Sequence, residues 1–220
     1  MGVSPVGVAF TGDGRLLVAD SVWKKVFIFS IKGDFVEEFA AGFPFQRPTA
    51  VAVSPWDNSV WVSDTLAHQV LRFSPAGEKL LALGKRGEKN GEFNYPTGIT
   101  VGKDGKIYVC DTLNARLQVF SPAGKFLAVF GKHGDSTGDF ANPKSVALDG
   151  EGHIYIVDGL FDAVQIFDEK GRLLLVFGQR GTKNGEFYVP VSIFIDEKDR
   201  IFVSDSYNGR IQIFQYLREY

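Results

Sequence analysis

One segment of the chain recurs, and this repetition constrains the fold more than any other feature. Residues 107–120 read Ile-Tyr-Val-Cys-Asp-Thr-Leu-Asn-Ala-Arg-Leu-Gln-Val-Phe, and residues 201–214 read Ile-Phe-Val-Ser-Asp-Ser-Tyr-Asn-Gly-Arg-Ile-Gln-Ile-Phe. Weaker copies begin at Leu16, Val60 and Ile154. The copies align on two markers. The first is an aspartate, found as Asp20, Asp64, Asp111, Asp158 and Asp205, and the differences between these numbers are 44, 47, 47 and 47 residues. The second is a proline, found as Pro5, Pro48, Pro96, Pro143 and Pro190. Two independent markers at one period make chance a poor explanation, and there are five copies.

Each copy is predicted to form four short β-strands. In the third copy we expect strands at 97–101, 107–110, 116–120 and 126–130, with turns at 103–106 and 121–124, and we expect Gln118 to point outward between apolar neighbours. The 25 glycines and 20 phenylalanines support strands joined by turns, because glycine in a helix interior costs about 1 kcal/mol relative to alanine. A four-stranded repeat of this length is typical of a propeller blade. The sequence therefore predicts an all-β fold, a β-propeller.

The recurring pattern runs Pro-x-Gly/Ser-Ile/Val, then Ile-Tyr/Phe-Val-x-Asp-Thr/Ser-x-Asn-x-Arg-Ile/Leu-Gln-Val/Ile-Phe. It resembles the NHL repeat over essentially the whole chain. The third and fifth copies match closely, whereas the others keep the Asp and the apolar frame and lose the Asn and Arg. The resemblance implies an NHL-type β-propeller, six-bladed in most of the family, that serves as an interaction scaffold and occasionally as an enzyme. Bacterial proteins that resemble this one are often exported or attached to the cell surface.

The length of the chain bears on how many blades it holds. We expect one propeller domain over residues 1–220, with repeats at approximately 5–47, 48–95, 96–142, 143–189 and 190–220, which gives four full blades and a three-stranded fifth. Six blades of this size would need a longer chain, so the expectation is a fragment of a six-bladed propeller, and a closed five-bladed ring is the alternative. An incomplete propeller leaves unpaired sheet edges, and self-association is expected if this one is incomplete.

The residues that recur in every copy are predicted to serve the fold. The aspartates Asp20, Asp64, Asp111, Asp158 and Asp205 each end a second strand ahead of a tight loop, where a short carboxylate accepts backbone N–H groups. In the two best copies an arginine follows five residues later, Arg116 after Asp111 and Arg210 after Asp205, within reach of an ion pair.

Binding is predicted where the copies differ, on the face that carries the long connectors between blades. These connectors span 84–96, 131–143 and 178–190 and share the form Gly-x-Arg/His-Gly…Gly-x-Phe-x-x-Pro. Loops held by a rigid scaffold are the usual place for recognition. The candidate binding residues on this face are Trp23, Lys25, His68, Arg86, His133, Lys144, Phe161, Arg180 and Tyr207. The partner they predict is a protein or a small ligand.

An enzyme is the first alternative, because peptide-amidating lyases, gluconolactonase-like hydrolases and streptogramin lyases belong to the same broad group of propellers. Their site would lie at the axial mouth. No catalytic residue, metal site or cofactor is predicted here: His68, His133 and His153 fall on separate loops, and no phosphate-cradling loop or nucleophile elbow is present. Single-stranded RNA binding on the connector face is the second alternative. A formal net charge of −2 and interleaved acidic and basic residues argue against nucleic acid.

The sequence leaves the compartment open. No apolar run approaches the roughly 20 residues of a membrane-spanning helix, and residues 1–10 contain no basic region followed by an apolar one. An N-terminally truncated chain would still be compatible with an extracytoplasmic location. The single cysteine, Cys110, carries no information on compartment.

Overall fold

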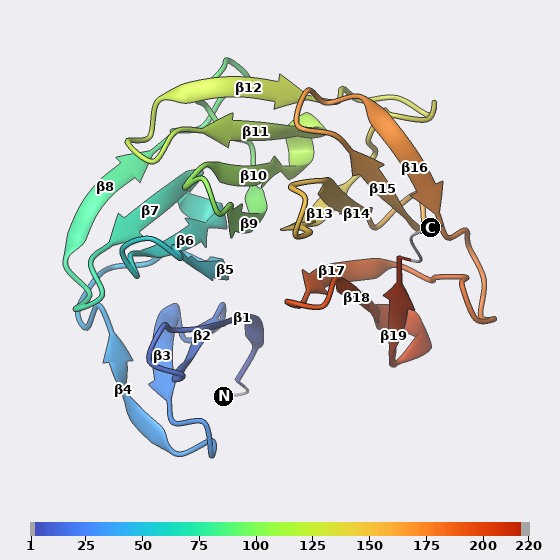
Figure 1. Cartoon of the computed structure of the whole chain (residues 1–220). Coiled ribbons are helices and arrows are strands. Elements are labelled where there is room, and N and C mark those ends of the chain that lie inside the picture. The colour runs from blue at the N-terminus through green and yellow to red at the C-terminus, as the bar shows by residue number, and fades with distance from the viewer. Residues whose placement is uncertain (1–2, 217–220) are drawn as a thin grey trace. The chain divides into compact units, whose positions relative to one another are not determined.

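The computed structural model describes residues 3–216, and their strands form five sheets (Figure 1). The residues divide into two compact units, one of 3–113 and 118–129 and the other of 114–117 and 130–216. The border between the units falls inside the third sheet. Residues 217–220, which belong to the predicted fifth repeat, lie outside the described residues.

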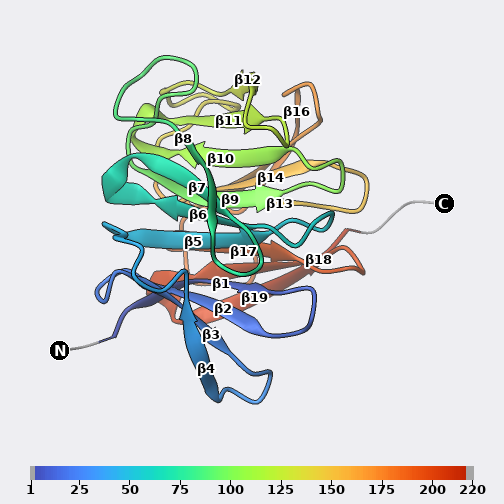
Figure 2. The same ribbon diagram turned by 90° about the vertical axis from the view of Figure 1, so that its left-hand side faces the viewer.

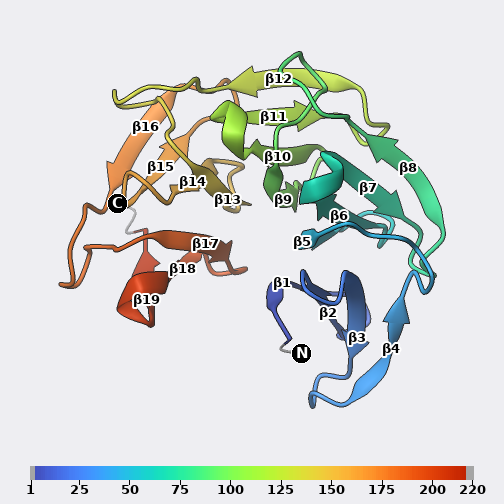
Figure 3. The ribbon, with the colours of Figure 1, turned by 180° about the vertical axis from the view of Figure 1, so that it is seen from behind.

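The first two sheets belong to the first unit, and each contains four strands in chain order. The first consists of β1 (Pro5–Phe10), β2 (Leu16–Asp20), β3 (Lys25–Phe29) and β4 (Phe35–Phe39), which lie side by side in Figures 1 and 2. The second consists of β5 (Pro48–Val53), β6 (Val60–Asp64), β7 (Gln69–Phe73) and β8 (Lys79–Leu83). A short 3₁₀-helix, η1 (Thr65–Ala67), joins β6 to β7 and is visible from behind in Figure 3.

The remaining three sheets follow the same plan. The third consists of β9 (Pro96–Val101), β10 (Ile107–Asp111), β11 (Arg116–Phe120) and β12 (Phe126–Phe130), with η2 (Thr112–Asn114) between β10 and β11. The fourth consists of β13 (Pro143–Leu148), β14 (Ile154–Asp158), β15 (Ala163–Phe167) and β16 (Leu173–Phe177). The fifth has three strands, β17 (Pro190–Ile195), β18 (Arg200–Asp205) and β19 (Arg210–Gln215), with η3 (Ser206–Asn208) before β19.

The all-β fold and the blade pattern predicted from the repeats are confirmed. Four blades have four strands, the fifth has three, and strands expected at 97–101 and 107–110 are each one residue longer, because Pro96 and Asp111 also pair. Gly105 and Gly124 take the positive φ of 76° and 82° that their turns require. The turns close with hydrogen bonds such as that from the Gly105 N–H to the Gly102 carbonyl.

The two faces of each blade pack on different neighbours. We call the leading face the one that carries Val62, Leu71 and Phe73 in the second blade, and the trailing face its opposite. In the first unit, the leading face of the second blade packs on the trailing face of the first, which contributes Leu17 and Val26. The trailing face of the second blade, with Trp61 and Val70, packs in turn on the leading face of the third, which contributes Ile99, Val109 and Phe120. In the second unit, the fourth blade's trailing face packs on the fifth blade's leading face in the same way.

This two-sided packing overturns one expectation. Gln118 was expected to point outward because it alternates with apolar residues, but its side chain is fully buried. In a blade between two others, both faces of the sheet are covered, so polar alternation no longer marks a solvent-facing side. Gln118 is buried with its hydrogen bonds satisfied, as described below.

None of the helices in residues 3–216 has the length and apolar character that crossing a lipid bilayer requires.

Candidate functional site

The long connectors fold back on themselves before they enter the next blade. In connector 178–190, the Phe187 N–H donates to the Gln179 carbonyl at 2.8 Å, and the Gly181 N–H donates to the Phe187 carbonyl at 2.9 Å. Connector 84–96 makes the equivalent bonds through Phe93, and connector 131–143 through Phe140. The rings of Phe93, Phe140 and Phe187 are fully buried. Each connector is therefore held by its own backbone hydrogen bonds and by one buried phenylalanine, which we call its aromatic wedge.

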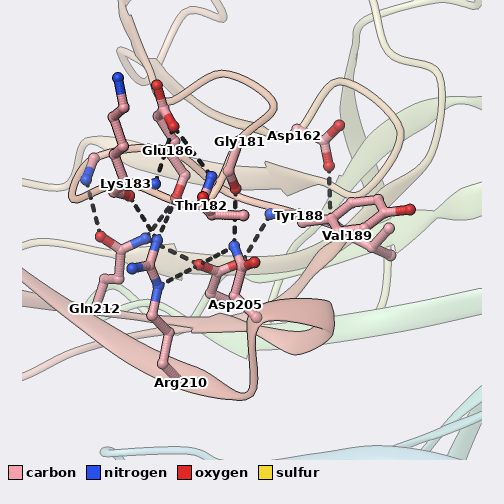
Figure 4. Close-up of polar contacts among 12 residues, drawn as sticks. Asp162, Gly181, Thr182, Lys183, Glu186, Tyr188, Val189, Asp205, Arg210 and Gln212 are labelled. Carbon is pink, nitrogen blue, oxygen red and sulfur yellow. Dashed lines mark hydrogen bonds and ion pairs between the residues drawn. The ribbon is translucent and has the colours of Figure 1, made fainter.

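Asp205 fastens connector 178–190 to the fifth blade (Figure 4). Its carboxylate accepts the Tyr188 N–H at 2.8 Å and the Arg210 Nε–H at 2.7 Å, and it also accepts Nδ2–H of Asn208. Arg210 donates further bonds to the carbonyls of Lys183, at 2.6 Å, and Glu186, at 2.9 Å. The aspartate therefore binds the connector directly and also through the arginine.

Gln212 holds the same connector through further hydrogen bonds. Its Oε1 accepts the Gly185 N–H at 2.9 Å, and its Nε2 donates to the Glu186 carbonyl at 2.7 Å (Figure 4). The same Nε2 lies 3.1 Å from Asp205 Oδ2. Gln118 and Gln165 hold the other two long connectors in this way, on Gly91 and Glu92 and on Gly138 and Asp139. The repeated glutamine serves the connector.

The hydrogen bonds around Asp205 set its protonation. Burial acts to raise the pKa of this carboxyl, but the Tyr188 N–H and the side chains of Asn208, Arg210 and Gln212 stabilise the carboxylate more strongly. Together they hold the pKa of Asp205 below its usual range. The group is therefore charged at neutral pH and acts as a fixed acceptor.

The connector that leads into the second blade is shorter and is held by apolar contacts. Its connector, 40–48, presents Phe43 and Phe45 to Phe73, with ring centroids 5.1 and 5.7 Å from that ring. Leu71 stands in β7 where the later blades have glutamine. Asp64 still accepts backbone N–H groups, those of Gln46 and Arg47.

An exposed aromatic and cationic cluster lies on connector 178–190 and the adjoining loop. The Arg180 guanidinium sits over the Tyr188 ring, 4.7 Å from its centroid. Tyr188 packs in turn against Tyr207, with ring centroids 5.0 Å apart, and 70% of Tyr207 is exposed to solvent. We call these three residues the Arg180–Tyr188–Tyr207 cluster. Two of them were candidates from the sequence. Tyr188 was not, because only the folded connector brings it to Tyr207.

His68 occupies a different environment from the exposed candidates. It is buried, and its Nδ1 accepts the Tyr95 N–H at 3.2 Å while its ring packs edge-on against Tyr95. Asp162 performs the equivalent task in the second unit, since its Oδ1 accepts the Val189 N–H at 2.7 Å (Figure 4). Because the His68 ring is buried and bonded to Tyr95, we leave His68 out of the proposed binding surface.

The other candidates do not join the cluster by any described contact. Arg86 and His133 lie exposed on their connectors, each in a bridge with the connector phenylalanine. Trp23 packs edge-on against Phe27, and Lys25 forms an ion pair with Glu38. Phe161 donates its backbone N–H to Asp158, and half-buried Lys144 lies in β13.

No three metal-ligating side chains of His, Cys, Asp or Glu gather anywhere in residues 3–216. The histidine with the closest acidic partner is His153, whose Nδ1 lies 2.8 Å from Asp149 Oδ2. The Tyr155 hydroxyl donates to the same oxygen. Burial, followed by the negative charge of Asp149, raises the pKa of Tyr155 above its usual value. Asp149 and His153 lie on the turn between β13 and β14, and Tyr155 follows in β14, at the ends of the strands away from the connectors.

Comparison with known families identifies repeats of one kind. The model of the NHL repeat matches residues 93–120 and 184–214, which include the third and fifth copies of the pattern. No curated protein sequence matches the chain.

Solved structures with a similar fold include both enzymes and a binding protein. A streptogramin B lyase superposes with a TM-score of 0.71 at 16% identity, covering 96% of this chain and 68% of the lyase. Virginiamycin B lyase from Staphylococcus aureus gives 0.68 at 17% identity, covering 96% and 70%. An auxiliary nutrient binding protein from Bacteroides ovatus gives 0.71 at 15% identity, covering 95% and 58%. At these identities the likeness establishes the fold alone.

Proposed function

We propose that this chain, a β-propeller with NHL repeats, is a non-enzymatic binding module. It binds a protein or a small ligand through its connectors. The observation that carries the proposal is the Arg180–Tyr188–Tyr207 cluster. Arginine and tyrosine are enriched among the residues that dominate binding energies, and tyrosine offers a large contact area at low entropic cost.

Rigidity of the supporting loop favours this role. The connector that bears Arg180 and Tyr188 is fixed by Asp205, Arg210 and Gln212, and the loop that bears Tyr207 is tied to it by a Tyr207 N–H bond to the Tyr188 carbonyl at 3.0 Å. A preorganised surface loses little entropy when a partner binds. The likeness to a nutrient binding protein is compatible with such a role, although it extends only to the fold.

A random-peptide display library panned against the immobilised protein tests the proposal. We expect enrichment of peptides whose affinity falls by about tenfold or more on the double variant Arg180→Ala/Tyr207→Ala, because these anchors supply the contact area. The matched control is Arg200→Ala, which removes another arginine that lies over a ring, Phe202 in β18, away from the connector. Peptides that bind wild type, control and double variant equally would contradict the proposal.

A lyase- or hydrolase-like enzyme is the second candidate, favoured by the two lyases among the similar structures. One further similar structure is a catalytically inactive histidine-to-alanine variant of virginiamycin B lyase with quinupristin, at 16% identity. Quinupristin is therefore the substrate to try first. Its conversion by the wild-type protein, abolished by an alanine substitution at His68, His133 or His153, would replace the binding proposal with the enzymatic one.

A further inference from the structure

The leading face of the first blade is exposed at its centre, where the equivalent positions of the second, third and fifth blades are buried. Val8 in β1 is 64% exposed, whereas its counterparts Val51, Ile99 and Ile193 are 6%, 7% and 6% exposed. Phe10 on the same strand is 57% exposed. Beside them Phe27 and Phe29 line a groove of about 560 Å³. This face has the composition of a blade interface but lacks a described partner.

The trailing face of the fifth blade shows the same departure. Ile211 in β19 is 67% exposed, whereas its counterparts Val70 and Val164 are fully buried. Ile213 and Phe194 are each 59% exposed. Soluble proteins rarely leave contiguous apolar patches of this kind uncovered, and such patches mark interaction sites.

The chain itself shows what covers each kind of face. Wherever blades pack inside a unit, a trailing face meets a leading face: the first blade on the second, the second on the third, and the fourth on the fifth. Equivalent positions line these contacts each time: Val26 and Val62 belong to the first cluster, and Val164 and Val203 belong to the last. The two exposed faces are thus of complementary types. Each aromatic side chain buries about 150–250 Å², so such faces approach the roughly 800 Å² per partner of a standard interface.

We infer that the leading face of the first blade binds the trailing face of the fifth blade of a second copy of this chain. Val8, Phe10 and Phe27 of one copy pack on Phe194, Ile211 and Ile213 of the other. The contact is heterologous, because the two surfaces differ, and each copy keeps one free surface of each kind that a further copy can occupy. It uses neither the connectors nor the Arg180–Tyr188–Tyr207 cluster.

Complementation between two single-face variants tests the inference. Val8→Lys places a charge on the leading face and Ile211→Lys on the trailing face, and both residues are solvent-exposed, so the fold should tolerate them. By sedimentation velocity from about 1 to about 100 µM, we expect wild type to associate and each variant alone to lose at least about tenfold in association constant. An equimolar mixture should form a dimer that grows no further, because each partner retains the face that the other lacks. The control is Leu174→Lys, an exposed apolar position on β16 outside both faces, which should associate as wild type does.

Three results would overturn the inference. Wild type could remain a monomer throughout the concentration range. Both variants could associate as strongly as wild type, which would place the contact elsewhere. The mixture could fail to recover the dimer, which would show that the two faces do not bind each other. Phe10→Lys and Ile213→Lys provide a second pair if either first variant loses its native circular dichroism. Peptide binding by the connectors should be unchanged in all four variants, which separates this test from that of the proposed function.

Discussion

Single polar residues hold the connectors, and they do so from inside the blades. Asp205 is fully buried and accepts four kinds of donor, and Gln212 reaches the same connector from the middle of β19. Buried polar groups are stabilising only when their hydrogen bonds are satisfied, and removal of one partner leaves the others unpaired. The cost of substitution should therefore rank by how many partners each residue serves.

Replacement of Asp205 by alanine should destabilise the protein by about 3–5 kcal/mol, because it leaves the Arg210 guanidinium and several N–H groups without their acceptor. Arg210→Ala should cost less, since the remaining donors still satisfy Asp205. Urea unfolding followed by circular dichroism measures both. Equal and negligible shifts of the midpoint would show that the aspartate does not hold the joint.

Acid should weaken the same joint. Since folding depresses the pKa of Asp205, its carboxylate contributes stability in full above the unfolded value of about 3.9 and loses it as the pH falls through the folded value. Unfolding free energies measured from about pH 6 to about pH 2 should therefore fall more steeply for wild type than for Asp205→Asn. Parallel curves for the two proteins would contradict this assignment.

At the scale of the element, connector length and the middle residue of the third strand change together. The three long connectors meet Gln118, Gln165 and Gln212, whereas the short connector 40–48 meets Leu71 and fills the space with Phe43 and Phe45. A polar strand residue supplies hydrogen bonds to a long loop, and an apolar one packs against a short aromatic loop. Both solutions fix the connector on the following blade.

Gln212→Leu should loosen connector 178–190 without unfolding the blade. The Gly185 N–H loses its acceptor and the Glu186 carbonyl keeps only its bond from Arg210, at a cost of about 1–3 kcal/mol for buried groups. Hydrogen exchange should quicken at Gly185 while the amides of β18 keep their protection. Unchanged exchange at Gly185 would mean that the connector is held by its own backbone alone.

The sequence was sufficient for the blades and insufficient for the site. In the third copy the sequence located the strands to within about one residue, because its inner strands are apolar on both faces and are bounded by glycine turns. The same burial on both faces made the inference about Gln118 wrong. The sequence did not indicate Tyr188 as a binding residue. Its contact with Tyr207 joins a connector to a loop of the next blade, and such a contact produces no periodic pattern in the sequence. His68 looked available until the fold supplied the Tyr95 N–H.

At the scale of the molecule, each unit is built by the same operation, a trailing face laid on the next leading face with an aromatic wedge between them. Hydrophobic burial between blades, rather than within one blade, therefore supplies most of the core. A blade taken alone would expose both of its apolar faces.

Dialysis against a chelator should leave the thermal midpoint unchanged, because the described residues present no set of three ligands that a structural ion would require. Differential scanning calorimetry before and after dialysis measures it. A lowered midpoint that zinc or calcium restores would reveal a site formed in another way.

The connector wedge has a consequence for how such a chain lengthens. Phe93 and the strand it wedges against fall within one matched repeat, 93–120, and Phe187 and Gln212 fall within the other, 184–214. A tandem duplication that copies one such stretch therefore carries the wedge together with its receptor. The new copy needs from its predecessor only a trailing face, which every copy already provides. The chain can therefore gain whole repeats by gene duplication without compensating changes elsewhere. An insertion that begins inside a blade would instead separate the wedge from the strand against which it packs.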